Sequence, residues 1–341
     1  MSVSMSSRDQ PELTRGQECL AQEVIAEEDI AEVYELERCV DWIRSSGYKR
    51  VALQFPDYLL SQAPTVCDCL RARLDSGEKV ELYILGDTTY SECCVDEIAA
   101  EHVGAEALVH YGHTCLTPPH SLPTLWVFTR RHCPVPLLTQ LVQDKFASDP
   151  RKVILLYDVE YEHLLGKLET DKVNLVIGRC SSTSSSSAAA GVQKFGRKFN
   201  FEDLSELENS VVVYVGKGEQ ALLNFIYSWP ENEFFVFDEG NLISAEVPVA
   251  RHMMKRYFLV EKAKDSERVG LLVGTLNTEK YLDIIEKLKT SGKKAGKRMY
   301  TFLVGKPNVA KLANFPEIDI FVLGSAFYTK IIIYPFLKTK L

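Results

Sequence analysis

Short apolar runs alternate with helical patterns along most of the chain, and this alternation restricts the fold more than any other feature. Early in the sequence, apolar runs at 51–55, 82–85 and 107–110 each end in a turn, and residues 95–103 between the last two have a helical pattern. Runs without polar alternation are typical of parallel strands that helices cover on both faces. The pattern therefore predicts an α/β fold of parallel sheets covered by helices.

The same α/β pattern begins three times, which predicts three similar βα-repeat domains. We place them at 30–150, 151–265 and 266–341, and the third supplies fewer complete βα units, so we expect it to be truncated. A Ser-rich loop at 181–190 interrupts the second domain. Residues 1–29 are rich in Ser, Glu and Gln and carry few large apolar side chains, so we expect a disordered acidic tail.

Charge and cysteine content limit the classes of partner and compartment. The net charge is −8, and residues 1–32 contribute −6 of it through eight acids and two arginines. The nearly neutral remainder does not favour nucleic acid or an anionic membrane surface as a partner. The chain has no signal peptide pattern and no apolar stretch of the roughly 18 residues that a membrane span needs. Nine cysteines, all at or before Cys180, suggest reduced thiols in the cytoplasm.

Three cysteines follow two neighbouring predicted strands. Cys93 and Cys94 come after the run at 82–85, and Cys115 comes after the run at 107–110. Loops that follow adjacent parallel strands open on the same edge of a sheet, so we expect these thiols to converge. Thiolates bind soft metals and iron–sulfur clusters, but buried cysteines also serve simply as small apolar residues. The residues alone leave both interpretations open.

Other features suggest weaker sites. Cys180 follows a predicted strand, and Gly216–Glu219 opens a helix where glycines can approach a phosphate. The segment 194–198 mixes aromatic and basic residues, which fits either a pocket lining or a surface turn. Three histidines surround Cys115 and could support a metal ligand or bond to the loop backbone: His110, His113 and His120.

Five spaced motifs carry a family resemblance. They are LQFPD at 53–57, ILGDTTYSECCVDE at 84–97, HYGHTCL at 110–116, FGRKF at 195–199 and KLANFPEIDIFVL at 311–323. Through them the chain resembles the diphthamide-synthesis radical enzymes over about residues 33–324. The resemblance implies three similar α/β domains around a central [4Fe-4S] cluster, which three cysteines hold while S-adenosylmethionine occupies the open iron.

The resemblance also implies a function. In this family's eukaryotic form, two related subunits transfer the 3-amino-3-carboxypropyl group of S-adenosylmethionine to a histidine of elongation factor 2. The chain resembles the second subunit, which implies a non-catalytic electron relay that takes electrons from a donor protein and helps reduce the catalytic cluster of subunit 1. Two alternatives remain: a cluster-free interaction protein that binds subunit 1, and a nucleotide-binding α/β enzyme that uses Gly216–Glu219.

Carried onto this chain, the family's site is incomplete. Cys94 and Cys115 match two of the cluster ligands, and Cys93 is a neighbour that could substitute. The family's third ligand follows the strand that corresponds to 320–323, where this chain reads Gly-Ser-Ala-Phe, and no cysteine occurs after Cys180. We therefore expect a C-terminally shortened form that binds a cluster weakly unless another cysteine replaces the third ligand.

Overall fold

The computed structural model describes most of the chain from residue 29 onward. The described ranges are 29–75, 79–86, 92–166, 168, 174–183, 192–201, 203–216, 219–238, 240–273, 281–304, 309–324 and 331–335. The acidic tail at 1–29 therefore lies outside the described residues except for Asp29, and so does the part of the Ser-rich loop at 184–190.

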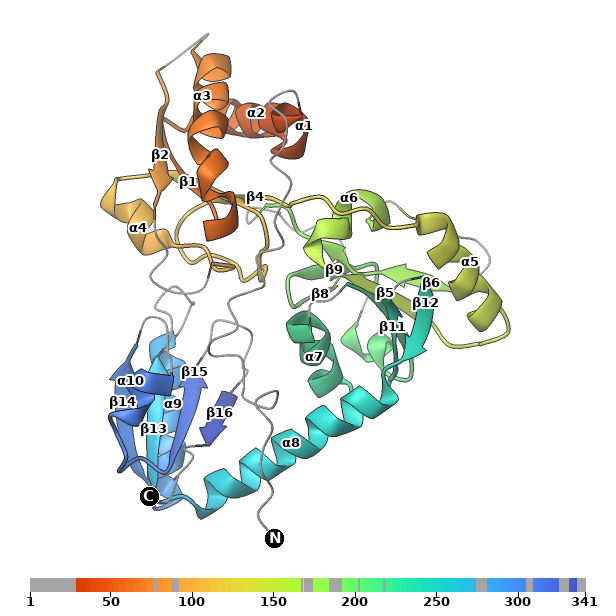
Figure 1. The fold of residues 1–341 in the computed structure, drawn as a ribbon, viewed down its shortest axis with the longest axis vertical. Coiled ribbons are helices and arrows are strands. Elements are labelled where there is room, and N and C mark those ends of the chain that lie inside the picture. Colours follow the sequence, from red (N-terminus) through yellow and green to blue (C-terminus); the bar gives the residue numbers. More distant parts are fainter. Residues whose placement is uncertain are drawn as a thin grey trace.

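Three sheets repeat one strand order, in which the first strand of each sheet lies between the second and the third (Figure 1). The first sheet runs β2-β1-β3-β4 and is parallel throughout. Its strands are β1 (Arg50–Gln54), β2 (Glu81–Leu85), β3 (Ala107–Tyr111) and β4 (Thr124–Val127). This repetition confirms the predicted α/β fold with parallel sheets.

The second and third sheets add an antiparallel strand at one edge. The second runs β12-β11-β10-β5-β6, with β5 (Val153–Tyr157), β6 (Leu175–Ile177), β10 (Val211–Val215), β11 (Glu233–Asp238) and antiparallel β12 (Asn241–Ser244). The third runs β14-β13-β15-β16, with β13 (Arg268–Val273), β14 (Arg298–Leu303), β15 (Ile320–Gly324) and antiparallel β16 (Ile331–Pro335). Sequence reasoning did not predict β12 or β16.

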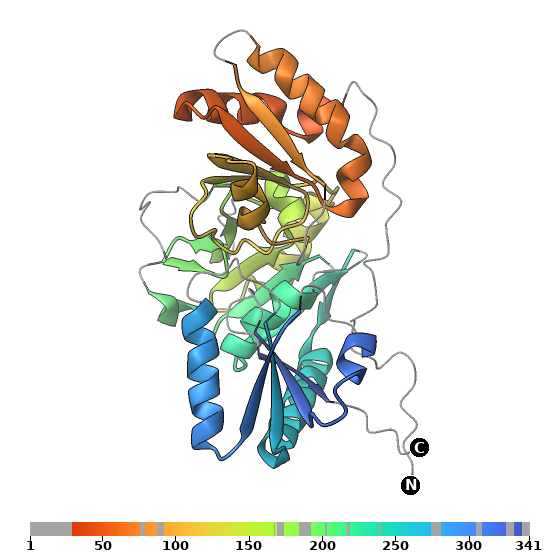
Figure 2. The ribbon, with the colours of Figure 1, turned by 90° about the vertical axis from the view of Figure 1, so that its left-hand side faces the viewer.

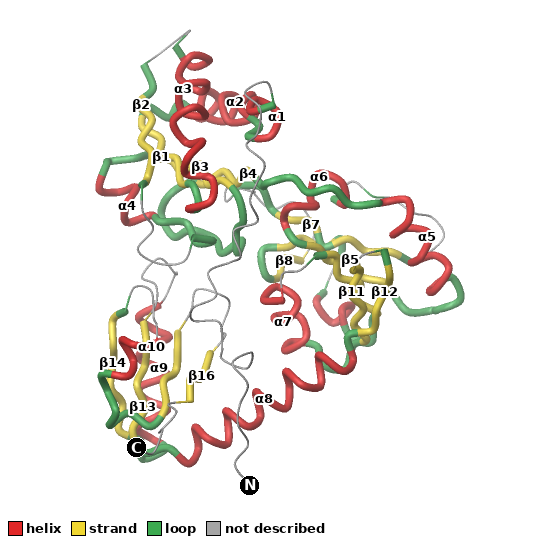
Figure 3. The backbone as a smooth tube through the Cα atoms, viewed as in Figure 1, coloured by secondary structure: helices red, strands yellow, loops and turns green. Residues whose placement is uncertain are grey.

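Helices cover these sheets, as Figure 3 shows. The first sheet has α1 (Ile30–Val33), α2 (Leu36–Ser46), the 3-10 turn η2 (Asp57–Gln62), α3 (Ala63–Leu74) and α4 (Glu97–His102). After β4, the described chain forms the helices and 3-10 turns α5 (Val135–Phe146), η3 (Val159–Tyr161), α6 (Glu162–Leu165), η4 (Leu204–Leu207), α7 (Glu219–Ser228), α8 (Glu246–Asp265), α9 (Tyr281–Lys294) and α10 (Val309–Ala313). Between β5 and β6 the described chain forms η3 and the four-residue α6 rather than one continuous helix.

Apolar spacing explains which face each helix buries. In α2, Leu36, Cys39, Val40 and Ile43 are buried and lie on one helical face at intervals of three and four residues. The helix ends at Gly47, whose φ of 72° is the left-handed conformation that glycine adopts without strain. This face packs against the first sheet together with α3.

The first and second sheets share a hydrophobic core. One buried cluster contains Ala52 and Leu108 of the first sheet together with Leu155 and Val213 of the second. The third sheet has a smaller core of its own, which includes Leu272 and Phe321 among others. The first two α/β units therefore pack as one body, whereas the third is built around a separate core.

The long helix α8 connects the second unit to the third, and Figures 1 and 2 show it extending between them. It contacts β11 of the second sheet and β16 of the third sheet. Three large apolar side chains on its central turns are exposed: Met254, Tyr257 and Phe258. Within the described ranges, no helix combines the length and apolar content needed to cross a membrane.

Candidate metal centre

Three cysteines converge at the carboxyl end of β1, the strand that lies between β2 and β3. Cys93 and Cys94 lie in the loop that leads from β2 to α4, and Cys115 lies in the loop that follows β3. Their sulfur atoms all lie within 4.8 Å of one another, and Cys94 Sγ is 3.8 Å from Cys115 Sγ. Cys93 and Cys94 are buried, while Cys115 is partly exposed. The predicted convergence of the two loops is confirmed.

Hydrogen bonds between the two loops hold the backbone of the first cysteine loop. The carbonyl of Cys93 accepts a bond of 3.1 Å from the Cys115 backbone N–H and one of 3.3 Å from the Thr114 hydroxyl. The neighbouring carbonyl of Glu92 lies 3.2 Å from Nε2 of His110, so that nitrogen must carry the proton. These bonds tie both cysteine loops to each other and to β3.

Gln54 holds the same loop from β1. Its side-chain amide donates a 2.8 Å bond to the carbonyl of Cys94, and its oxygen accepts a 2.9 Å bond from the backbone N–H of Asp96. Asp96 in turn caps α4 by accepting a bond from the backbone N–H of Ala99. Three consecutive carbonyls, at 92–94, thus have partners from β1, β3 and the second cysteine loop, and this restricts where the thiols can point.

The thiols are electrostatically inequivalent. Hydrogen bonds from Cys93 and Cys94 hold the pKa of the Cys115 thiol well below its usual range, and the Thr117 hydroxyl lies 3.1 Å from its sulfur. The same interaction with Cys115 raises the pKa of Cys94 well above its usual range. Of Cys94 and Cys115, Cys115 therefore loses its proton first and becomes a thiolate, the form that binds metals.

The buried imidazole of His110 supports the loop and lies outside the group of thiols. Burial lowers its pKa to about 4, which keeps the ring neutral. Its Nδ1 has no hydrogen-bond partner in the described part of the chain. His113 and His120 contribute through their backbone N–H groups, which bond to the Tyr58 hydroxyl and the Glu97 carboxylate. Of the alternatives for these histidines, the described contacts favour loop support.

Cys180 lies apart from the three thiols. It belongs to β7 (Arg179–Cys180), which forms a small antiparallel sheet with β8 (Val192–Lys194) and β9 (Arg197–Phe199). Its sulfur accepts a 3.2 Å bond from the guanidinium of Arg197, and burial raises its pKa to about 12. Within the described residues, the group that could share one ion contains only Cys93, Cys94 and Cys115.

Sequence reasoning missed the hairpin of β8 and β9 as a neighbour of the site. Its turn contains Gly196 at φ 70°, and a Cβ built there would lie 2.2 Å from the Cβ of Leu116, the residue after Cys115. The second unit also bonds to β4, because the Trp126 backbone N–H donates to the carbonyl of Ser182. The FGRKF motif contained the signal, since a glycine between two large residues often marks a close approach.

The proposed phosphate site gains no support from its neighbours. Lys217 and Gly218 lie outside the described residues. Gly216 faces the carboxylate of Asp158, since a Cβ there would lie 2.1 Å from Oδ2. A carboxylate so close to the turn opposes phosphate binding.

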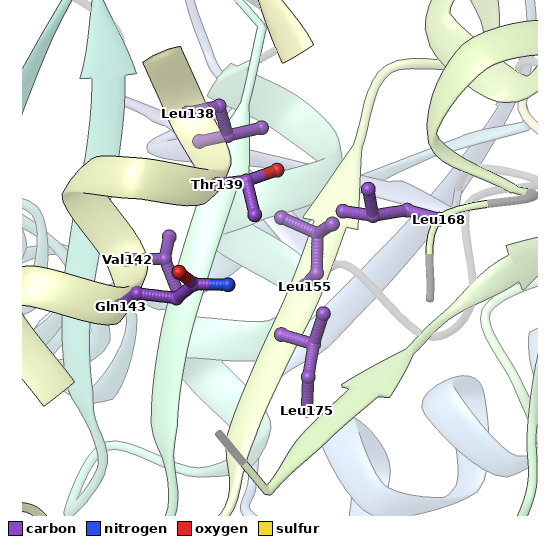
Figure 4. A pocket seen from close by; sticks show the side chains of 7 residues that line it. All are labelled: Leu138, Thr139, Val142, Gln143, Leu155, Leu168 and Leu175. Carbon is purple, nitrogen blue, oxygen red and sulfur yellow. The ribbon is translucent and has the colours of Figure 1, made fainter. Parts of the chain in front are cut away.

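Figure 4 shows a small hollow between α5, β5 and β6. Its lining residues are Leu138, Thr139, Val142, Gln143, Leu155, Leu168 and Leu175. None of these side chains is charged, and the Thr139 hydroxyl already donates to the backbone carbonyl of Val135. The hollow therefore presents aliphatic packing and no convergent polar groups.

The chain consists of repeated α/β units, and the loops that follow two of its strands present thiols. It therefore belongs to the general class of α/β proteins with a cysteine site at the edge of a sheet. The family model of diphthamide synthesis proteins matches residues 55–326. The chain belongs to this diphthamide synthesis family, as the sequence motifs indicated.

Curated relatives agree with this assignment. The chain is 43% identical over 303 residues to 2-(3-amino-3-carboxypropyl)histidine synthase subunit 2 of Gallus gallus, covering 86% of this chain and 63% of that protein. It is 39% identical over 303 residues to the protein of the same name from Xenopus laevis, covering 87% and 63%. The chain thus spans about 63% of the length of these relatives.

Solved structures share the fold. The crystal structure of Dph2 from Pyrococcus horikoshii matches with a TM-score of 0.62 at 21% identity, covering 85% of this chain and 83% of that one. The structure of the same protein with a 4Fe-4S cluster matches with a TM-score of 0.60 at 20% identity, covering 84% and 82%.

Proposed function

We propose that the chain acts as the second subunit of a heterodimeric synthase for the first step of diphthamide biosynthesis. The complex transfers a 3-amino-3-carboxypropyl group from S-adenosylmethionine to a histidine of elongation factor 2. Membership of the family and the names of the curated relatives support this proposal. The observation that carries it is the convergence of Cys93, Cys94 and Cys115 at the edge of the first sheet.

The thiols suit the cofactor that the family implies. Iron–sulfur clusters take cysteine thiolates as ligands, and here two loops present thiols in a largely buried position. Cys94 and Cys115 would hold the cluster, with Cys93 as a substitute ligand beside them. A bound cluster would supply one-electron chemistry to the complex.

The role proposed for this subunit is electron relay in the cytoplasm. It receives an electron from a donor protein and passes it to the catalytic cluster of subunit 1, which carries out the transfer. The chain's own residues support such a role by holding the loops: the bonds to the carbonyls at 92–94 reduce the rearrangement of the ligands when charge changes. Burial of Cys93 and Cys94 also limits access of water to the site.

The test combines cofactor content with function. The chain, co-expressed with subunit 1 in cells that lack their own second subunit, should co-purify with it and restore the modified histidine, detected by mass spectrometry of the elongation factor 2 peptide. Cys94→Ala and Cys115→Ala should lose both iron and modification. Cys69→Ala, on α3 and outside the group of three thiols, is the matched control and should retain both.

Two results separate the alternatives. Co-purification with subunit 1 and no iron under anaerobic conditions would identify a cluster-free interaction protein. Absence of both pairing and modification with the wild-type chain would defeat the proposed function.

A further inference from the structure

We propose that Thr117 sets how readily the metal centre accepts an electron, because its hydroxyl donates a hydrogen bond to the sulfur of Cys115. Thr117 acts through Cys115 and is therefore a positioning residue and not a ligand. The inference rests on the proposed function, since it requires that Cys115 holds the cluster. It adds the residue that tunes the reduction potential of that site.

The contact joins the Thr117 side chain directly to a ligand sulfur. Thr117 Oγ1 lies 3.1 Å from Cys115 Sγ. A protonated thiol can donate to this hydroxyl, but a thiolate or metal-bound sulfur has no proton, so the hydroxyl then has to donate. The pKa of the Cys115 thiol is held well below its usual range by hydrogen bonds from the two neighbouring cysteines and, to a smaller extent, from the hydroxyl and backbone N–H of Thr117. Both Thr117 groups therefore favour negative charge on this sulfur.

The local sequence holds the hydroxyl in place. Thr117 precedes Pro118, which restricts its backbone to extended conformations, and its β-branched side chain has few allowed rotamers. Leu116, between Cys115 and Thr117, has a φ of 57°. Gly196 of the neighbouring hairpin packs closely against Leu116 and supports this turn. Because the donor is already oriented, it needs little rearrangement when the charge on the sulfur changes.

The hydroxyl dipole favours the reduced state. Reduction adds one electron, which the donor protein supplies, and part of the added negative charge lies on the ligand sulfurs. No bond to Thr117 forms or breaks in this step, and its hydroxyl keeps its proton. Hydrogen bonds to ligand sulfurs are among the factors that set cluster potentials, and a donor stabilises the more negative state. The site is largely buried, so water screens this interaction little. Thr117 therefore raises the reduction potential.

Three variants separate the hydroxyl from the shape of the residue. Thr117→Val removes the hydroxyl and puts a methyl group in its place, which keeps water out of the donor position. Thr117→Ser keeps the hydroxyl and should restore wild-type behaviour. Thr114→Val is the contrast, because the Thr114 hydroxyl lies in the same loop but donates to the Cys93 carbonyl, at 3.3 Å, and accepts from the Leu116 N–H. This variant loosens the loop and leaves the donor to the sulfur intact.

The experiment uses the full chain, purified anaerobically and reconstituted with iron and sulfide. A redox titration followed by electron paramagnetic resonance gives the midpoint potential of each variant. Thr117→Val should reduce the equilibrium constant for reduction at least about threefold, which is about 28 mV to more negative potential at 59 mV per tenfold for one electron. Thr117→Ser should match the wild type, and Thr114→Val should shift by less than half as much as Thr117→Val. In electron–nuclear double resonance, the wild type should show one exchangeable proton coupling that Thr117→Val lacks.

Each outcome decides the inference. Equal potentials in wild type and Thr117→Val, at equal iron content, overturn it and leave the proposed function intact. An equal shift in Thr114→Val also overturns it, because loosening of the loop is then the cause. If Thr117→Val loses its iron, Thr117→Ser decides: wild-type iron and potential support the role of the hydroxyl, whereas loss of iron there too shows a role of shape and overturns the inference. A wild-type chain that binds no iron defeats the cluster assignment and this inference with it.

Discussion

Replacing Gly196 with alanine should disturb the metal centre from the neighbouring α/β unit. The new Cβ would lie 2.2 Å from the Cβ of Leu116 and 2.8 Å from its carbonyl oxygen. Leu116 directly follows Cys115, and its own φ of 57° lies in the left-handed region that a leucine rarely adopts. The substitution therefore pushes on the residue whose backbone positions the third thiol.

The magnitude has two parts. A left-handed backbone at φ 70° costs an alanine about 1 kcal/mol relative to glycine. Carbon atoms that approach to 2.2 Å must separate by more than about 1 Å to reach ordinary contact, and forcing extra methyl groups into packed regions costs about 1–3 kcal/mol. Gly196→Ala should thus destabilise the first two units by about 2–4 kcal/mol.

Gly47→Ala is the matched control. Gly47 has nearly the same φ, 72°, but a Cβ there meets no heavy atom within 4 Å. It should show only the backbone cost of about 1 kcal/mol. Urea unfolding of both variants measures the difference, and the iron retained after anaerobic purification should fall in Gly196→Ala alone. Equal unfolding midpoints and equal iron content for the two variants would refute the inferred contact between the hairpin and the Cys115 loop.

Three further variants test the supports of the site. Gln54→Leu leaves the buried Cys94 carbonyl and a backbone N–H without partners, so urea unfolding should show a loss of about 2–4 kcal/mol; an unchanged midpoint would show that Gln54 does not support the loop. Arg197→Met removes the donor to the Tyr157 carbonyl, and thermal unfolding should show a loss of about 1–3 kcal/mol, with no change if that bond is absent. His110 stays neutral when folded because burial lowers its pKa to about 4, whereas the unfolded chain binds the proton below about pH 6.5. Stability should therefore fall by up to about 3 kcal/mol as pH drops from about 6.5 to about 4, and His110→Gln should show a shallower fall in urea unfolding followed across that range.

The local pattern was enough to predict much of the fold. Continuous apolar runs such as 51–55 and 107–110 are typical of strands buried on both faces, and β1 and β3 are such strands. The hairpin of β8 and β9 escaped prediction because its strands have three residues each and no apolar periodicity. Likewise, the antiparallel pairing of β16 depends on β15, a partner that the local sequence does not specify.

The sequence by itself determined that Cys93, Cys94 and Cys115 would meet, because loops after adjacent parallel strands open on one edge of the sheet. Its motifs also identified the family. Only the tertiary structure decided that Cys180 bonds to Arg197 instead of joining the three thiols, and that Gly196 packs on the Cys115 loop. The physical reason is that the first outcome depends on the pairing of β7 with β9 and the second on how the second unit packs on the first. Contacts between segments far apart in the sequence leave no periodic signal in either segment.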